Sequence, residues 1–205
     1  TKKKTTTVPK TKSEIKFISF PQTKAPPTFA VDVVNILKKH EKKITTFFDR
    51  GSGKGLASDT VLAIIRDDLL KLGWKVEKNK KKKIIYPIFY RENGDPKTFE
   101  VDAHHPGYKC ILEVEAGRSN SGGHNVYKDI FEAISMDEVD FLIVAVPLRY
   151  WSNKTVEKKD KSGKKIDIKI RDFEKCYEKS KDDIGTILYS QRRVDMPYGL
   201  TIIGY

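Results

Sequence analysis

The sequence has few of the features that place a protein in a membrane or in an oxidising compartment. Its 205 residues include only two cysteines, Cys110 and Cys176, which are too few and too far apart for a disulfide framework or a zinc ribbon. No apolar run approaches the ~20 residues that a membrane-spanning helix needs. Residues 1–16 lack the apolar stretch of a secretory signal. We therefore expect a cytoplasmic (intracellular) protein with no membrane partner.

Several catalytic motifs are missing as well. The segment GSGKG at 51–55 lacks the first glycine of a P-loop and has Gly55 where the motif needs Ser or Thr. We therefore reject it as a nucleotide site, although a loop that meets DNA stays open. No Ser-His-Asp spacing is present, and Cys110 is expected on a buried face. His104 and His105 are adjacent on an expected strand and should point oppositely, so His104 could line a site but His105 should not.

Positive charge is plentiful. Lys and Arg number 40 against 28 Asp and Glu, which gives a formal net charge of +12. An excess of this size favours polyanionic partners such as nucleic acid, while a protein that is merely basic and soluble remains the alternative. The hydrophobic fraction of 38% is too high for a wholly disordered chain, so a folded domain is expected.

The chain divides into an arm and a domain. Residues 1–28 are rich in Lys, Thr and Pro, which predicts a flexible basic N-terminal arm with one docked strand at Ile15–Phe20. Such an arm could grasp phosphates, but a solvated terminus is the favoured interpretation. Residues 29–205 are expected to form a single domain with its core at about 56–150.

The hydrophobic periodicity predicts the elements of that domain. Helices are expected at 29–44, 58–72 and 125–136, with a helical stretch near 173–181. Ser58 or Asp59 should cap the second helix, and Gly73 should stop it in a left-handed conformation. Strands are expected at 74–77, 84–90, 98–104, 109–116, 139–147 and 200–205, with a hairpin around Ser162 and Gly163. This order predicts an α/β fold with a central mixed β-sheet flanked by helices. The strand at 84–90 should be part of that sheet.

The apolar faces of two helices can be predicted in the same way. For the helix at 58–72 the expected face is Val61, Leu62, Ile64, Ile65, Leu69 and Leu72. For the helix at 125–136 it is Val126, Ile130, Phe131 and Ile134. The run at 139–147 is almost wholly apolar, which indicates a strand buried on both faces.

The segment FEVDAHHPGYKCILEVEAG, residues 99–117, carries a group of acids. Alternate strand residues share a face, so Glu113 and Glu115 should stand beside Ile111, while Cys110, Leu112 and Val114 point into the core. A turn at 106–108 would bring Asp102 across from the two glutamates. Three converging carboxylates repel one another, and bound Mg²⁺, with Mn²⁺ as a substitute, would relieve that repulsion. A solvated sheet face is the alternative.

This pattern resembles the PD-(D/E)XK nuclease superfamily, whose restriction-endonuclease-like core runs helix, three strands, helix, strand. Asp102 matches the first acidic position, and Glu113-Val-Glu115 matches the (D/E)XK element with Glu in place of Lys. Val101 stands in place of the usual Pro. The ExE form is similar to the BamHI/BglII-type branch of type II restriction endonucleases, as are ILEVEAGR, NVYKDIFEA and FLIVAVP. The resemblance covers about residues 56–150.

The resemblance implies roles for the acids. Asp102 and Glu113 would hold the metal ion, and Glu115 would act on the attacking water. Lys128 would replace the missing positive charge, or else be a surface lysine. Glu100 and Asp59 could add carboxylates, although a solvated position and a helix cap are their expected roles. Candidates for DNA contact, by position or charge, are Arg118, Ser119, Asn120, His124, Asn125, Lys128, Arg192 and Arg193.

The sequence therefore predicts a Mg²⁺-dependent endonuclease of double-stranded DNA, acting as a type II restriction enzyme and as a homodimer. Two rivals remain open. One is a repair, resolvase or mobile-element nuclease on the same core, and the other is a non-catalytic DNA-binding protein. The recognition sequence and the cut position do not follow from the sequence.

Overall fold

The structure, a computed structural model of the whole chain, describes residues 13–45, 56–78, 83–115, 125–159, 163–190 and 199–205. Its centre is a six-stranded sheet in the order β1 (Lys16–Phe20), β10 (Gly199–Gly204), β7 (Phe141–Val146), β6 (Cys110–Val114), β5 (Ala103–His105), β2 (Lys75–Val76). Strands β6, β7 and β10 are parallel, and the other pairings are antiparallel. The expected mixed sheet is thus confirmed.

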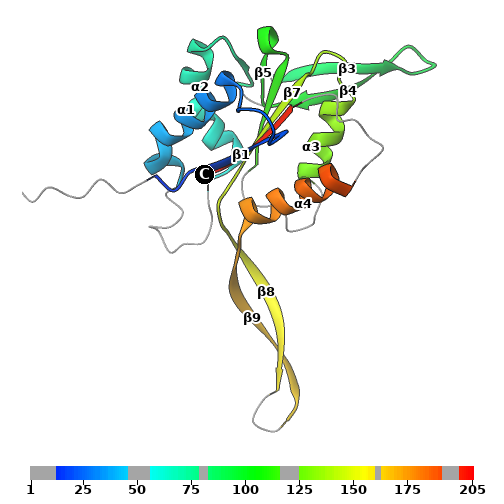
Figure 1. Cartoon of the computed structure of the whole chain (residues 1–205). Coiled ribbons are helices and arrows are strands. Elements are labelled where there is room, and N and C mark those ends of the chain that lie inside the picture. Colours follow the sequence, from blue (N-terminus) through cyan, green and yellow to red (C-terminus); the bar gives the residue numbers. More distant parts are fainter. Residues whose placement is uncertain (1–12, 46–55, 79–82, 116–124, 160–162, 191–198) are drawn as a thin grey trace, which may run out of the picture.

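Two helices cover each face of this sheet (Figure 1). Helices α1 (Thr28–Ile44) and α2 (Ser58–Lys71) pack on one face, and α3 (Asn125–Ile134) and α4 (Cys176–Ser190) on the other. All six residues of β7 are buried, alternately in the two hydrophobic cores. The prediction of a strand buried on both faces is confirmed, because this strand lies in the middle of a sheet that is covered on both sides.

The ends of α2 differ in part from the prediction. Gly73 has φ +88°, so the left-handed stop is confirmed. The residue before the helix is Ala57, and no side chain makes a capping hydrogen bond, so the caps predicted at Ser58 or Asp59 are wrong. Leu72 is 42% exposed because the helix ends at Lys71 and the next residue turns away from the core.

The N-terminal segment contributes β1, which pairs with β10. Between these strands the Ser19 and Thr201 hydroxyls form a buried hydrogen bond of 2.6 Å. The docked strand expected inside the basic arm is therefore present, whereas residues 1–12 lie outside the described residues.

Segment 84–90 does form a strand but does not join the central sheet. Strands β3 (Ile84–Tyr90) and β4 (Pro96–Val101) form a separate two-stranded sheet. Pro87 lacks a backbone N–H, so β3 could not complete its hydrogen bonds with a neighbouring strand on each side. The register of its pairing with β4 also shifts between Pro87 and Phe89. A strand with this proline suits a two-stranded ribbon better than the middle of a sheet.

The predicted hairpin around Ser162 and Gly163 is confirmed as a second ribbon. Strand β8 (Tyr150–Lys159) pairs along its whole length with β9 (Lys165–Glu174). Residues Phe173 and Glu174 belong to β9, so the helix predicted near 173–181 begins later, at Cys176. In the part of the chain that the structure describes, no helix has the length and apolar character that crossing a membrane requires.

Two adjacent leucines of α2 provide a test of this packing. Leu69 is fully buried, whereas Leu70 is 48% exposed. Leu69→Ala should lower the free energy of unfolding by about 2–5 kcal/mol, because it leaves a cavity in the core. Leu70→Ala should change it by less than about 1 kcal/mol. Urea unfolding of both variants measures the difference, and equal losses would contradict the described orientation of α2.

Candidate functional site

A tight turn brings Asp102 to the strand that carries the glutamates. Strands β5 and β6 pair antiparallel with Ala103 opposite Leu112, and residues 106–108 form a single 3-10 turn between them. Lys109 completes the turn with φ +47°. Asp102 lies between β4 and β5, where its Oδ2 accepts a hydrogen bond of 2.7 Å from the backbone N–H of Val114. The predicted juxtaposition of Asp102 with the acidic strand is confirmed.

Strand β6 is covered on both of its faces. Cys110, Leu112 and Val114 pack with α1 and α2, as predicted. On the other face Ile111 is fully buried with residues of α3 and α4. Glu113 follows Ile111 on that face, and its Oε1 is shut off from solvent without a hydrogen-bond partner among the described residues. A carboxylate oxygen in this position is costly unless something positive satisfies it.

Glu115 comes just after the end of β6, and its backbone is held firmly. Its N–H donates to the carbonyl of Ala145 at 2.8 Å, so the pairing of β6 with β7 continues beyond the strand. Its carbonyl accepts from the Tyr205 hydroxyl, also at 2.8 Å. The half-buried Glu115 is thus placed at the carboxyl ends of the two parallel strands.

The carboxylates raise one another's pKa values. Burial raises the pKa of Asp102 to about 6; the Val114 N–H opposes this, and the charges of Glu77 and Glu115 add to it. Burial also raises the pKa of Glu113 well above its usual value, and the charges of Asp102 and Asp129 act in the same direction. Each group is therefore harder to ionise than a free carboxyl, as expected where negative charge gathers without a counter-ion.

Helix α3 adds acids that the sequence analysis did not predict as site residues. Asp129 is 1% exposed, and its Oδ2 has no hydrogen-bond partner among the described residues. Burial, followed by the charge of Glu115, raises its pKa to about 8. Glu132, 6% exposed, lies one turn further along the helix. The signal was available, because Asp129 is three residues after Val126 and shares the buried stripe of the helix.

The predicted apolar face of α3 is correspondingly wrong in part. Val126 and Ile130 are buried as predicted, but Phe131 is 64% exposed and Ile134 40% exposed. The buried stripe turns instead through Asp129, Glu132 and Ala133. This rotation of the helix directs its acidic residues toward the strand that carries Glu113.

The side chain of Lys128 brings a positive charge close to these acids. The Lys128 ammonium is 3.0 Å from Glu132 Oε2 and 3.6 Å from Asp129 Oδ1. Its charge also lowers the pKa of Glu113, although burial outweighs it. Lys128 is exposed and paired with Glu132, and its charge acts on Glu113 and Asp129.

Glu77 and Asp59 approach Asp102 from the other side. The Glu77 N–H donates to the Asp102 carbonyl at 2.8 Å, and Arg66 of α2 donates to the Glu77 carbonyl at 2.8 Å. Burial and the charge of Asp59 raise the pKa of Glu77. The charge of Asp59 also contributes to the raised pKa of Asp102, and its side chain makes no capping hydrogen bond.

Glu100 and the histidines lie apart from this group. Glu100 is exposed and bonds to Lys83, so the expected solvated position is confirmed. His104 is buried, with Nδ1 bonded to the Tyr86 hydroxyl. Burial lowers its pKa, followed by the charges of Lys75 and His105, with Glu138 opposing. The ring of His105 contacts the Leu72 carbonyl at 3.0 Å on its Nε2 side and accepts from Tyr108 N–H at Nδ1, a structural role.

Most of the residues predicted to contact DNA fall outside the segments that the structure describes. The loop GSGKG and the candidates Arg118, Ser119, Asn120, His124, Arg192 and Arg193 lie outside the described residues. Asn125 is the first residue of α3, the helix that carries Asp129 and Glu132.

The donor set fits a hard divalent cation, which favours carboxylate oxygens. Two carboxylate oxygens, Glu113 Oε1 and Asp129 Oδ2, are buried without a partner among the described residues. Asp102 and Asp129 raise the pKa of Glu113, and Glu115 raises the pKa values of Asp102 and Asp129, while Lys128 offsets only part of the effect. As the side chains stand, no three His, Cys, Asp or Glu residues of the described segments are arranged to hold one ion. Asp102 and Glu113 are the residues that would do so, with Asp129 nearby.

Comparison with protein-family models, with curated proteins and with solved structures finds no match for this chain.

The pKa of Asp129 predicts a change of stability with pH in metal-free protein. Asp129 titrates at about 8 in the folded state and at about 3.9 when unfolded. Between these values the folded state binds more protons, so ionisation of Asp129 lowers stability as pH rises. In EDTA, the free energy of unfolding of Asp129→Asn, relative to that of wild type, should therefore rise by more than about 1 kcal/mol from pH 4 to pH 8. Urea unfolding measures this gain.

A matched control is Asp137→Asn, which removes an exposed carboxylate shortly after α3. If the relative free energy of unfolding rises equally in the two variants from pH 4 to pH 8, burial of Asp129 is not the cause of the rise.

Proposed function

We propose that this protein is a Mg²⁺-dependent endonuclease that hydrolyses phosphodiester bonds of double-stranded DNA, as a sequence-specific type II restriction enzyme. The observation that carries this proposal is the buried Oε1 of Glu113, which has no partner among the described residues and lies close enough to Asp102 for the charge of Asp102 to raise the pKa of Glu113. The net charge of +12 supports a polyanionic substrate.

The arrangement of elements supports the same proposal. In the central sheet, helix α2 is followed by strands β2, β5 and β6, and then by α3 and β7, while β3 and β4 form a separate ribbon between β2 and β5. This is the order helix, three strands, helix, strand that the resemblance to the PD-(D/E)XK superfamily implies. Asp102 falls at the second of these strands and Glu113 on the third, which are the positions that the resemblance assigns to the metal-binding acids.

Each acid would have its own role in the hydrolysis. Asp102 and Glu113 would hold the divalent cation, which supplies positive charge to the scissile phosphate and to a bound water. Glu115 would orient the attacking water and accept its proton as the oxygen bonds to phosphorus. The bond from phosphorus to the leaving sugar oxygen breaks, and that oxygen takes a proton from solvent. Lys128 would offset part of the negative charge that gathers during attack.

A homodimer forms part of this proposal. Hydrolysis of both strands of a duplex needs two sites related in the way the strands are related. A two-fold symmetric pair of chains meets this need and matches a palindromic site.

Cleavage of a long mixed-sequence duplex tests the activity. With Mg²⁺ the protein should produce discrete fragments, and with EDTA none. Asp102→Asn and Glu113→Gln should each lower the rate at least about 100-fold, since removal of one stabilising group from a preorganised site costs about that much. Glu100→Gln is the matched control, because it removes one charge on β4 at an exposed position bonded to Lys83.

The outcomes separate the rival functions. A smear in place of fragments would retain hydrolysis and remove sequence specificity. Cleavage confined to branched or damaged DNA would indicate a repair or resolvase nuclease. DNA binding without cleavage in either Mg²⁺ or Mn²⁺ would indicate a non-catalytic DNA-binding protein.

Metal binding can be measured without activity. At pH 8, Mg²⁺ should raise the thermal unfolding midpoint by a few degrees, because an ion that binds only the folded state stabilises it by mass action. Asp102→Asn should reduce this shift, whereas Glu100→Gln should retain it. NaCl at equal ionic strength controls for screening. An equal shift with NaCl alone would contradict a specific Mg²⁺ site.

A further inference from the structure

The β8–β9 ribbon begins at the edge of the sheet where the acids lie. Strands β6 and β7 are parallel, so their carboxyl ends share one edge. Glu115, just past β6, bonds to Ala145 near the end of β7. The ribbon starts at Tyr150, four residues after β7 ends at Val146. Anything bound across this edge would therefore meet both the acidic group and the base of the ribbon.

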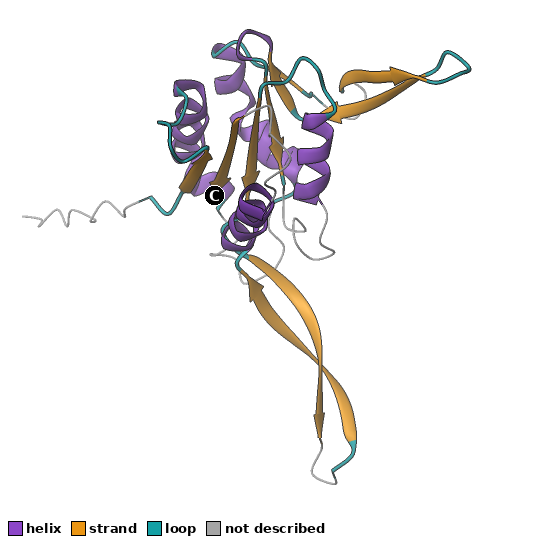
Figure 2. Ribbon diagram, turned by 45° about the vertical axis from the view of Figure 1, so that its right-hand side comes forward, coloured by secondary structure: helices purple, strands orange, loops and turns teal. Residues whose placement is uncertain are grey.

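The ribbon projects from the body, as Figure 1 and Figure 2 both show. Its strands have ten residues each, and among the described strands they pair only with each other. At about 3.4 Å per residue the ribbon is about 34 Å long. That length is close to one turn of B-form DNA, about 34 Å. A two-stranded ribbon is also of a width that the major groove admits.

The far end of the ribbon is strongly basic. Residues 158–165 read KKDKSGKK, with five lysines and one aspartate. Lys158, Lys164 and Lys165 are exposed. Lys165 is 2.5 Å from Glu157, so part of its charge is offset within the ribbon. The remaining excess still makes the end of the ribbon attractive to phosphates.

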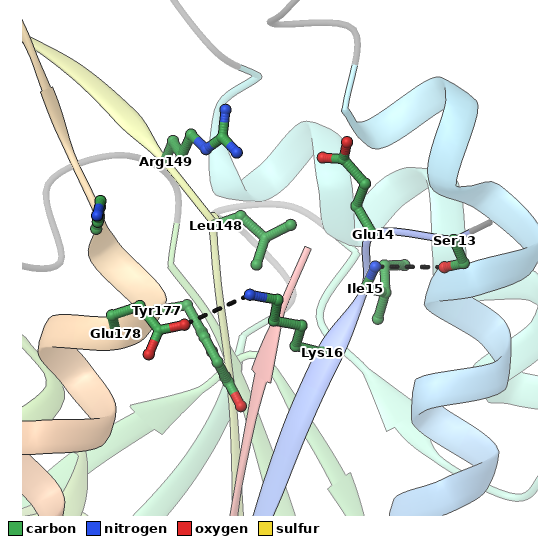
Figure 3. Close-up of a pocket in the computed structure, with 9 residues that line it drawn as sticks. Ser13, Glu14, Ile15, Lys16, Leu148, Arg149, Tyr177 and Glu178 are labelled. Carbon is green, nitrogen blue, oxygen red and sulfur yellow. Dashed lines mark hydrogen bonds and ion pairs between the residues drawn. The ribbon is translucent and has the colours of Figure 1, made fainter. Parts of the chain in front are cut away.

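The base of the ribbon is also basic. Arg149 and Lys175, both exposed, come immediately before and after the two strands. They line a pocket of about 890 Å³ together with Lys16, Glu14 and Glu178 (Figure 3). Lys16 is 3.5 Å from Glu178, so the acids of this pocket are already engaged in part.

We propose that the β8–β9 ribbon is a DNA-holding arm that lies along the same duplex whose phosphate reaches the carboxylates. The lysines at its far end bind phosphates about one helical turn away, and Arg149 and Lys175 bind phosphates at its base. This inference rests on the proposed function for its substrate, but it concerns binding and not hydrolysis.

The alternative partner for a projecting ribbon is a second copy of the chain. Charge argues against it, because the ends of two ribbons would bring like charges together. A polyanion has the complementary charge. The ribbon is therefore assigned to DNA, and a role in self-association becomes an outcome of the test.

The test measures binding of a labelled duplex of about 30 base pairs to the full chain in EDTA, over a range of NaCl concentrations. The ribbon variant replaces Lys158, Lys164 and Lys165 with Ala. The matched control replaces Lys24, Lys38 and Lys42, exposed lysines before and within α1, so both variants lose three charges. The ribbon variant should bind about 10-fold more weakly at about 0.1 M NaCl, and its salt slope should fall by about 2–3. The control should change binding less than about twofold.

A shortened ribbon gives a second, independent variant. Replacing residues 157–167 with Asn-Gly closes the hairpin directly at the Val156–Ile168 pair. It should weaken binding at least as much as the three substitutions while the thermal unfolding of the body is retained. Equal weakening by the ribbon and control substitutions would overturn the proposal. So would a shortened chain that changes from dimer to monomer by sedimentation with its DNA affinity unchanged.

The same samples separate this inference from the proposed hydrolysis. Weakened binding in the ribbon variants, with no Mg²⁺-dependent cleavage by wild type, supports the arm and contradicts the nuclease. Cleavage by wild type, with ribbon variants that bind as the control does, supports the nuclease and contradicts the arm.

Discussion

One hydrogen bond holds the first acid of the candidate site against strand β6. The Val114 N–H, at the end of β6, donates to the Asp102 carboxylate across 2.7 Å. Asp102 itself lies where the chain leaves the β3–β4 ribbon and enters the central sheet. The bond therefore holds the first acid against the strand that carries Glu113. It also opposes the rise in the pKa of Asp102 that burial causes.

Burial of the acids sets a conflict between stability and function. The sheet is covered on both faces, which stabilises the domain through its two hydrophobic cores. The same covering encloses Glu113 and Asp129 and raises their pKa values. Carboxylates that are hard to ionise destabilise a folded chain near neutral pH. Under the proposed function, a bound cation would relieve that cost.

The position of the acids along the sheet has a further consequence. Glu113 and Glu115 stand at the carboxyl ends of parallel strands, where the chain leaves the sheet. The β8–β9 ribbon, which follows β7, begins at this edge. It therefore extends from the place where the carboxylates gather, while both faces of the sheet are covered by helices.

The sequence by itself determined the elements and the identity of the central acids. The alternation in ILEVE, the left-handed stop at Gly73 and the apolar run of β7 each report local backbone preference or burial along one element. The short turn at 106–108 was enough to predict that Asp102 meets β6. Such features depend on residues close in the chain, so periodicity and turn chemistry reveal them.

Only the tertiary structure decided the rest. The rotation of α3, which buries Asp129 and exposes Phe131, depends on how the helix packs on β6 and β7. The approach of Glu77 and Asp59 to Asp102 depends on α2 and β2 meeting at one edge. The separation of β3 and β4 from the central sheet depends on which strand pairs with β5. Each is set by contacts between residues distant in sequence, and the free energy of those contacts leaves no periodic signal in a single chain.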